Sequence, residues 1–79
     1  MTSKGRTVEN LIETRHTRAC VLSMTHILAA LKAEDPATAK FHFDLAYAAG
    51  IGAEAAADTE AERIVAKHLR EAVQEAREA

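Results

Sequence analysis

The chain has 79 residues, a formal net charge of −2 and one cysteine, Cys20. This length allows one domain, the single cysteine excludes an internal disulfide and a multi-cysteine metal site, and the small negative charge gives no global attraction to nucleic acid or to an anionic membrane. No apolar stretch is long enough for a signal peptide or a membrane span, so we expect a cytoplasmic protein.

Large apolar side chains are scarce. Apolar residues make up 48% of the sequence, but 18 of them are alanine, which leaves 20 larger apolar side chains to form a core. A chain this short buries only about 60% of the surface that its unfolded form exposes, so its stability margin is small. We therefore expect it to bury further apolar surface against a second copy or another protein.

The predicted organisation is a short polar segment followed by one all-α domain. Residues 1–6 are polar and are expected to be disordered, and residues 7–79 are expected to be helical. The predicted helices span residues 7–34, 36–49 and 53–77, a long–short–long order with short connectors, which we expect to pack as a homodimeric helical bundle.

The first predicted helix carries two apolar stripes. One starts at Val8, the other contains Met24, Ile27 and Leu31, and at about 100° per residue the two do not share a face. Either the helix breaks or kinks near residues 14–18, or it is continuous and presents one face to each of two neighbours. The absence of glycine and proline favours the continuous helix.

The second predicted helix has clear boundaries in the sequence. Asp35 is a good N-cap and Pro36 suits the first helical position, while Gly50 is expected to end the helix as a left-handed cap. Residues 41–47 alternate apolar and polar side chains as a strand would, but the neighbouring alanines and the Asp-Pro start favour a helix.

Aromatic residues of this helix suggest a binding surface. One helical face carries four apolar residues, namely Ala37, Phe41, Leu45 and Ala48. Phe43 and Tyr47 then lie on nearly the opposite face. Either both faces are buried in a core or a dimer, or Phe43 and Tyr47 form an exposed anchor for a partner, since aromatic residues dominate binding hot spots.

The last helix is predicted to begin near residue 53 or near residue 59, because Thr59 and Glu62 have capping-box spacing. Its apolar stripe is the most regular in the chain and consists of Ala61, Ile64, Val65, His68, Leu69, Ala72, Val73 and Ala76. Such a stripe is typical of a bundle or coiled-coil helix. We predict that Ile64, Val65, His68, Leu69 and Ala72 contact a partner.

Catalytic and metal chemistry have little support. Glu13 and His16 have the Glu-x-x-His spacing of di-iron helix bundles, but the stripe of the last helix offers no inward carboxylate to complete such a site. Cys20 and Ser23 lie in a predicted helix without a loop of backbone N–H groups to hold an oxyanion. We predict no catalytic residue, no metal site and no cofactor.

Residues 45–51 carry a local motif. Ala46, Gly50 and Ile51 have the spacing of the small, glycine and aliphatic positions at the turn, and the segment resembles the first helix and turn of helix-turn-helix DNA-binding modules. The resemblance covers about ten residues and implies a DNA-binding regulator. The segment that would be the recognition helix has no Arg, Lys, Asn or Gln to read bases, and its acids would repel phosphate.

These patterns predict a small, non-enzymatic protein–protein interaction module: a regulator, adaptor or inhibitor that packs helices against a partner. Its expected partners are a second copy of itself and an unidentified protein, rather than a membrane or nucleic acid. The alternatives are a helix-turn-helix-like DNA-binding regulator and a metal-binding helical bundle. The candidate surfaces are the Met24–Ile27–Leu31 face, the Phe43–Tyr47 pair and the stripe of the last helix.

Overall fold

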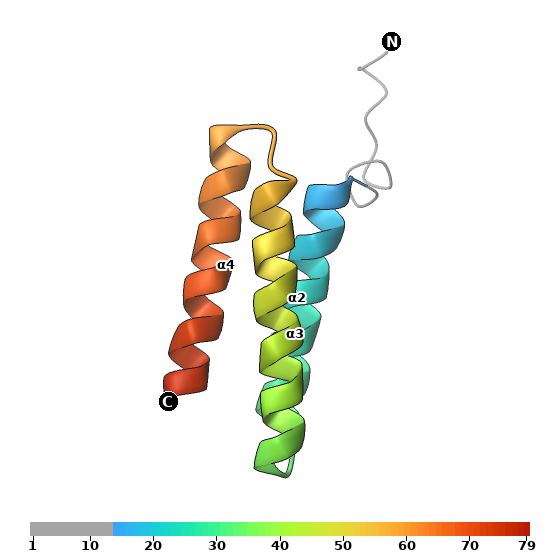
Figure 1. Cartoon of the computed structure of the whole chain (residues 1–79), viewed down its shortest axis with the longest axis vertical. Helices are drawn as coiled ribbons and strands as arrows, with labels where there is room; N and C mark the ends of the chain where they lie inside the picture. Colours follow the sequence, from blue (N-terminus) through green and yellow to red (C-terminus); the bar gives the residue numbers. More distant parts are fainter. Residues whose placement is uncertain (1–13) are drawn as a thin grey trace.

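The computed structural model describes residues 14–79, which form three α-helices: α2 (Arg15–Lys32), α3 (Pro36–Ala55) and α4 (Glu60–Glu78). The middle helix, α3, packs antiparallel against both neighbours, whereas α2 and α4 touch each other little (Figure 1). The described part of the chain contains no strand, so the predicted all-α class is confirmed and residues 41–47 are helical. The expectations for residues 1–6 and for the stripe at Val8 lie outside the described residues.

The start of α2 decides between the two readings of the first helix. Thr14 has an extended backbone (φ −68°, ψ 149°), and its hydroxyl accepts a hydrogen bond from the backbone N–H of Thr17 at 3.2 Å. A hydroxyl in this position satisfies an N–H that the first helical turn leaves without a partner. The helix therefore begins at Arg15, and the favoured continuity through residue 14 is not observed.

The start of α3 is the one that the sequence predicts. The Asp35 carboxylate accepts hydrogen bonds from the backbone N–H and the hydroxyl of Thr38, both at 2.8 Å, and Pro36 occupies the first turn. Because these donors stabilise the charged form, they hold the pKa of Asp35 below its usual value.

The end of α3 differs from the prediction. The helix continues through Gly50 and Gly52 to Ala55, and no glycine among residues 14–79 has a positive φ, so the expected left-handed cap at Gly50 is wrong. A Cβ added at Gly50 would lie 3.3 Å from Cγ of Arg70 on α4. Gly50 therefore allows α4 to approach α3 closely and does not form a turn. With 20 residues, α3 is not the short helix of the predicted long–short–long order.

The two glycines of α3 are expected to respond differently to alanine. Gly52→Ala should raise the free energy of unfolding by about 0.5–1 kcal/mol, because alanine favours the helix and a Cβ there meets nothing within 4 Å. Gly50→Ala should gain less, since its Cβ presses on Arg70. Urea denaturation of both variants measures the difference, and equal stabilisation would argue against the close approach at Gly50.

The start of α4 agrees with the later of the two predicted positions. Thr59 is the N-cap and its hydroxyl accepts from the backbone N–H of Glu62 at 3.1 Å. The Glu62 carboxylate accepts in turn from the backbone N–H of Asp58 at 2.6 Å, one residue before the position of a standard capping box.

Small side chains form the interior. Cys20, Ala53 and Ala66, one from each helix, pack together, with Ala19 and Leu69 partly buried beside them. The remaining buried apolar residues are Ala30, Ala46 and Val73. Alanine and glycine allow the helix axes to approach closely.

The core face of α3 is therefore not the one expected from its larger residues. Phe41 and Leu45 are exposed, while Ala46, Gly50 and Ala53 are buried. The reason is steric: a helix packed on both sides at short range places its smallest side chains inward.

Polar contacts complete the packing of α4 on α3. The Arg70 guanidinium donates to the Glu54 carboxylate at 2.8 Å, and the Arg77 guanidinium lies over the Tyr47 ring, 5.1 Å from its centroid. Between α2 and α3, the buried Ser23 hydroxyl donates to the Ala46 carbonyl at 2.8 Å. No helix within residues 14–79 is long and apolar enough to cross a membrane.

Candidate protein-binding face

Most of the larger apolar side chains lie on the surface. Residues 14–79 contain sixteen apolar side chains larger than alanine, of which ten are exposed and only Cys20 and Val73 are buried. Monomeric proteins do expose single apolar residues, so what matters is whether these ten are scattered or gathered.

Four of them form one line along α2. Val21, Met24, Leu28 and Leu31, the α2 strip, are spaced by three, four and three residues, and each is exposed, Leu28 by 58% and Leu31 by 63%. Thr17 extends the line by one turn. This alternation of three and four is the spacing of a coiled-coil seam, which places the side chains on one face of a helix that meets another helix.

A second line runs along α4. Ala61, Val65, His68 and Ala72, the α4 strip, are all exposed, Val65 by 49%. They occupy the side of α4 next to its buried positions Ala66 and Val73. His68 is the only titratable group of the strip, and its Nδ1 lies 3.6 Å from the Glu71 carboxylate.

The two strips lie next to each other. α2 and α4 meet at the cluster that contains Cys20 and Leu69. Met24 follows Cys20 by one turn on α2, and Val65 and Ala72 are the helical neighbours of Leu69 on α4, so both strips leave the cluster on the side that α3 does not cover. Neither strip contains a charged side chain, and the two strips together are called the apolar face.

The residues predicted for partner binding lie on different surfaces of the structure. Five of them lie on the apolar face: Met24, Leu31, Val65, His68 and Ala72. Ile27 and Leu69 are half-buried at its inner border. Ile64 is exposed on another side of α4, where it lines a shallow pocket with Glu54 and Arg63.

Phe43 and Tyr47 lie away from this face. Both are half-buried on the α4 side of α3, and Arg77 covers the Tyr47 ring. Val21 and Leu28 were not among the predicted contact residues, because the predicted stripe runs through Met24, Ile27 and Leu31. Thr17, Val21 and Leu28 are separated by four and seven residues, which places them on one face of a helix, and this spacing could have identified them.

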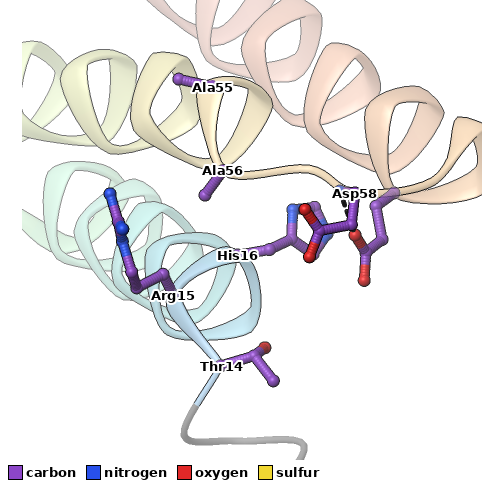
Figure 2. Close-up of a pocket in the computed structure, with 7 residues that line it drawn as sticks. Thr14, Arg15, His16, Ala55, Ala56 and Asp58 are labelled. Atoms are coloured by element: carbon purple, nitrogen blue, oxygen red, sulfur yellow. Dashed lines mark hydrogen bonds between the residues drawn. The ribbon is translucent and has the colours of Figure 1, made fainter.

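A shallow pocket lies at the end of the bundle where α2 begins and α3 connects to α4. Figure 2 shows the His16 ring extending from α2 toward Asp58, with Thr14, Arg15 and Ala56 around it. The His16 Nδ1 donates to the Ala53 carbonyl at 3.0 Å, since a carbonyl can only accept. Its Nε2 lies 3.6 Å from Cys20 Sγ.

The thiol next to this pocket is a poor nucleophile. Burial raises the pKa of Cys20, and the nearby charge of Glu62 raises it further, so the neutral thiol is favoured over the reactive thiolate. The His16–Cys20 contact lies within α2 and does not activate the sulfur.

A histidine pair joins α2 and α3. Nδ1 of His26 lies 2.9 Å from Nδ1 of His42, and the stacked rings have centroids 5.1 Å apart. One ring must donate and the other accept, so the pair shares one proton at this contact. His42 is half-buried here.

The alternative functions can be compared with this geometry. Within residues 14–79 no three or more metal-ligating side chains cluster, and Glu13 of the Glu-x-x-His motif lies outside the described residues. Residues 45–51, which resemble part of a helix-turn-helix, lie inside the continuous helix α3, so the expected turn is absent there. No protein-family model, curated protein or solved structure matches the chain.

Proposed function

We propose that this protein is a non-enzymatic interaction module that acts by burying its apolar face against another protein chain. The role that fits is a small regulator, adaptor or inhibitor in the cytoplasm, which changes its partner by occupying a surface. Self-association into a homodimeric helical bundle is part of the proposal, because a second copy offers the same uncharged surface.

One observation carries the proposal. The α2 strip places four large apolar side chains in coiled-coil spacing on the surface, while the interior consists mostly of alanine. Burying a Leu or Met side chain contributes on the order of 1.5–3 kcal/mol, so covering the exposed side chains of the α2 strip is strongly favourable.

The partner can be identified by comparative affinity purification from the host cell. The bait is the full chain with a tag, either unaltered or carrying Leu28→Glu on the α2 strip. We expect proteins bound by the unaltered bait to be lost with L28E, because a buried carboxylate without a partner is strongly unfavourable.

Leu22→Glu supplies the matched control. Leu22 is 51% exposed but lies on the other side of α2, outside the apolar face. L22E should retain the partners. Equal recovery of the same proteins with L28E and with the unaltered chain would count against the apolar face as the binding surface.

A further inference from the structure

Three side-chain hydrogen bonds join α2 to α3 within residues 14–79, and one of them differs from the others in its response to protons. In two of them the acceptor is a backbone carbonyl of α3, and the donors are His16 Nδ1 and the Ser23 hydroxyl. A carbonyl accepts whatever the charge of the donor. The third joins two histidines, His26 and His42, here called the histidine pair. Both of these rings can gain a proton near neutral pH, so this contact depends on pH at both ends.

The two rings of the histidine pair meet through their Nδ1 atoms. The ring planes differ by 23°, the Nδ1 atoms are 2.9 Å apart, and the ring centroids are 5.1 Å apart. This centroid distance is close to the Nδ1 contact plus the two ring radii, so both Nδ1 atoms lie near the line between the ring centres. Phe41 packs its ring nearly perpendicular to that of His42. The geometry is that of a hydrogen bond with one proton between the two nitrogens.

The histidine pair has no charged neighbour on α2 or in the connector that follows it. The nearest charged residues of α2 are Arg18 and Lys32, eight and six residues from His26. Glu34 and Asp35 lie in the connector, where the Asp35 carboxylate is the N-cap of α3. Neither carboxylate forms an ion pair with the histidine pair in the described part of the chain.

The charged residues of α3 and α4 near this level point elsewhere. Lys40 and Asp44 lie two residues before and after His42, and residues two apart do not share a helical face. They pair with each other at 2.9 Å, and Asp44 also lies 4.0 Å from Arg77 of α4. Among residues 14–79, no carboxylate is therefore placed to offset a second positive charge on the histidine pair.

The contact tolerates one added proton but not two. When one ring is charged, its Nδ1–H still donates and the neutral ring still accepts. When both rings are charged, each Nδ1 carries a hydrogen and neither can accept. Two like charges would also face each other at the 2.9 Å contact, which is repulsive. The rings must then separate.

We infer that the histidine pair is a pH-sensitive contact, which holds α2 against α3 near neutral pH and breaks in mild acid. The folded chain keeps the contact with at most one added proton, whereas the unfolded chain binds two. Because the unfolded state binds more protons, the stability contributed by the contact is present near neutral pH and is lost as the pH falls. This inference is independent of the proposed function, since it concerns the contact between α2 and α3 and not the apolar face.

The variant that tests this is His42→Asn. An asparagine amide is neutral at every pH, and its oxygen can accept from His26 whether or not that ring is charged. Urea denaturation of the full chain at one fixed protein concentration is compared at about pH 7.5 and about pH 5, the range over which histidine changes charge. We expect the acid to raise the unfolding equilibrium constant of the unaltered chain about tenfold more than that of H42N, since one proton of difference gives up to about tenfold per pH unit.

His68→Asn is the matched control, because His68 is exposed on α4 and joins no two helices. H68N should keep the acid sensitivity of the unaltered chain within about threefold. An H42N chain that is as acid-sensitive as the unaltered one, or an H68N chain that loses the sensitivity, would overturn the inference.

A second measurement needs no variant. Nitrogen NMR of the imidazole rings in the unaltered chain reports the charge of each ring during an acid titration. We expect one ring of the histidine pair to stay neutral for as long as α2 remains packed on α3. Two charged rings at His26 and His42 in a chain whose α2–α3 contacts persist would contradict the inference.

Discussion

Leu28→Glu is expected to weaken self-association by at least about 100-fold, equivalent to roughly 3 kcal/mol, and to leave the protein monomeric at micromolar concentration. Leu28 is at the middle of the α2 strip and 58% exposed in the single chain, so the glutamate is solvated in the monomer. In the dimer it would be buried among apolar side chains twice, once per copy. Sedimentation equilibrium or light scattering over a concentration series measures the change.

The control for this prediction is again Leu22→Glu, which changes the same side chain in the same helix. Leu22 is 51% exposed and lies on the opposite side of α2 from Leu28. L22E should keep the dissociation constant of the unaltered chain within about threefold, since surface substitutions outside an interface have small effects. If L22E dissociates the dimer and L28E does not, the interface lies on that opposite side.

Ala53→Leu is expected to lower the free energy of unfolding by about 2 kcal/mol, and Tm by roughly 10 °C. Ala53 is fully buried where α2, α3 and α4 meet, in contact with Cys20 and Ala66. Three added carbon atoms cannot fit there unless the helices separate, which would also lengthen the hydrogen bond from His16 to the Ala53 carbonyl.

Thermal unfolding followed by circular dichroism tests this, at one fixed protein concentration because association raises Tm. Ala48→Leu is the matched control, since Ala48 lies in the same helix but is exposed. It should change the free energy of unfolding by no more than about 0.5 kcal/mol. An Ala53→Leu chain as stable as the Ala48→Leu chain would show that the helices are not held together through their small residues.

Some features of this protein followed from the sequence because their cause is local. The Asp35 carboxylate and Pro36, which has no backbone N–H, fix the start of α3. The hydroxyl of Thr59 fixes the start of α4 as an N-cap. The all-α class followed from helix-forming residues and from the lack of any strand partner. The shortage of large apolar residues predicted burial against a second chain, which stays a prediction.

Other features depended on which surfaces meet. Burial in a core or a dimer was predicted for the face of Phe41 and Leu45, and a left-handed cap was predicted at Gly50, because large side chains usually point inward and glycine often ends a helix. In the structure Arg70 approaches Gly50 closely and the helix continues through it, and Cys20 and Ala66 pack on Ala53, so that Phe41 and Leu45 lie outside the core of the single chain.

The candidate site shows the same division. Periodicity identified Met24, Leu31, Val65, His68 and Ala72 as apolar positions on their helices, but it could not tell an inward face from an outward one. Only the packing of α3 against the alanine-rich sides of its neighbours turned the strips outward and brought them together. The sequence determines where each helix begins and which positions are apolar, and tertiary contact decides which apolar positions remain for a partner, because burial depends on the distance between helices and not on the side chains of one helix alone.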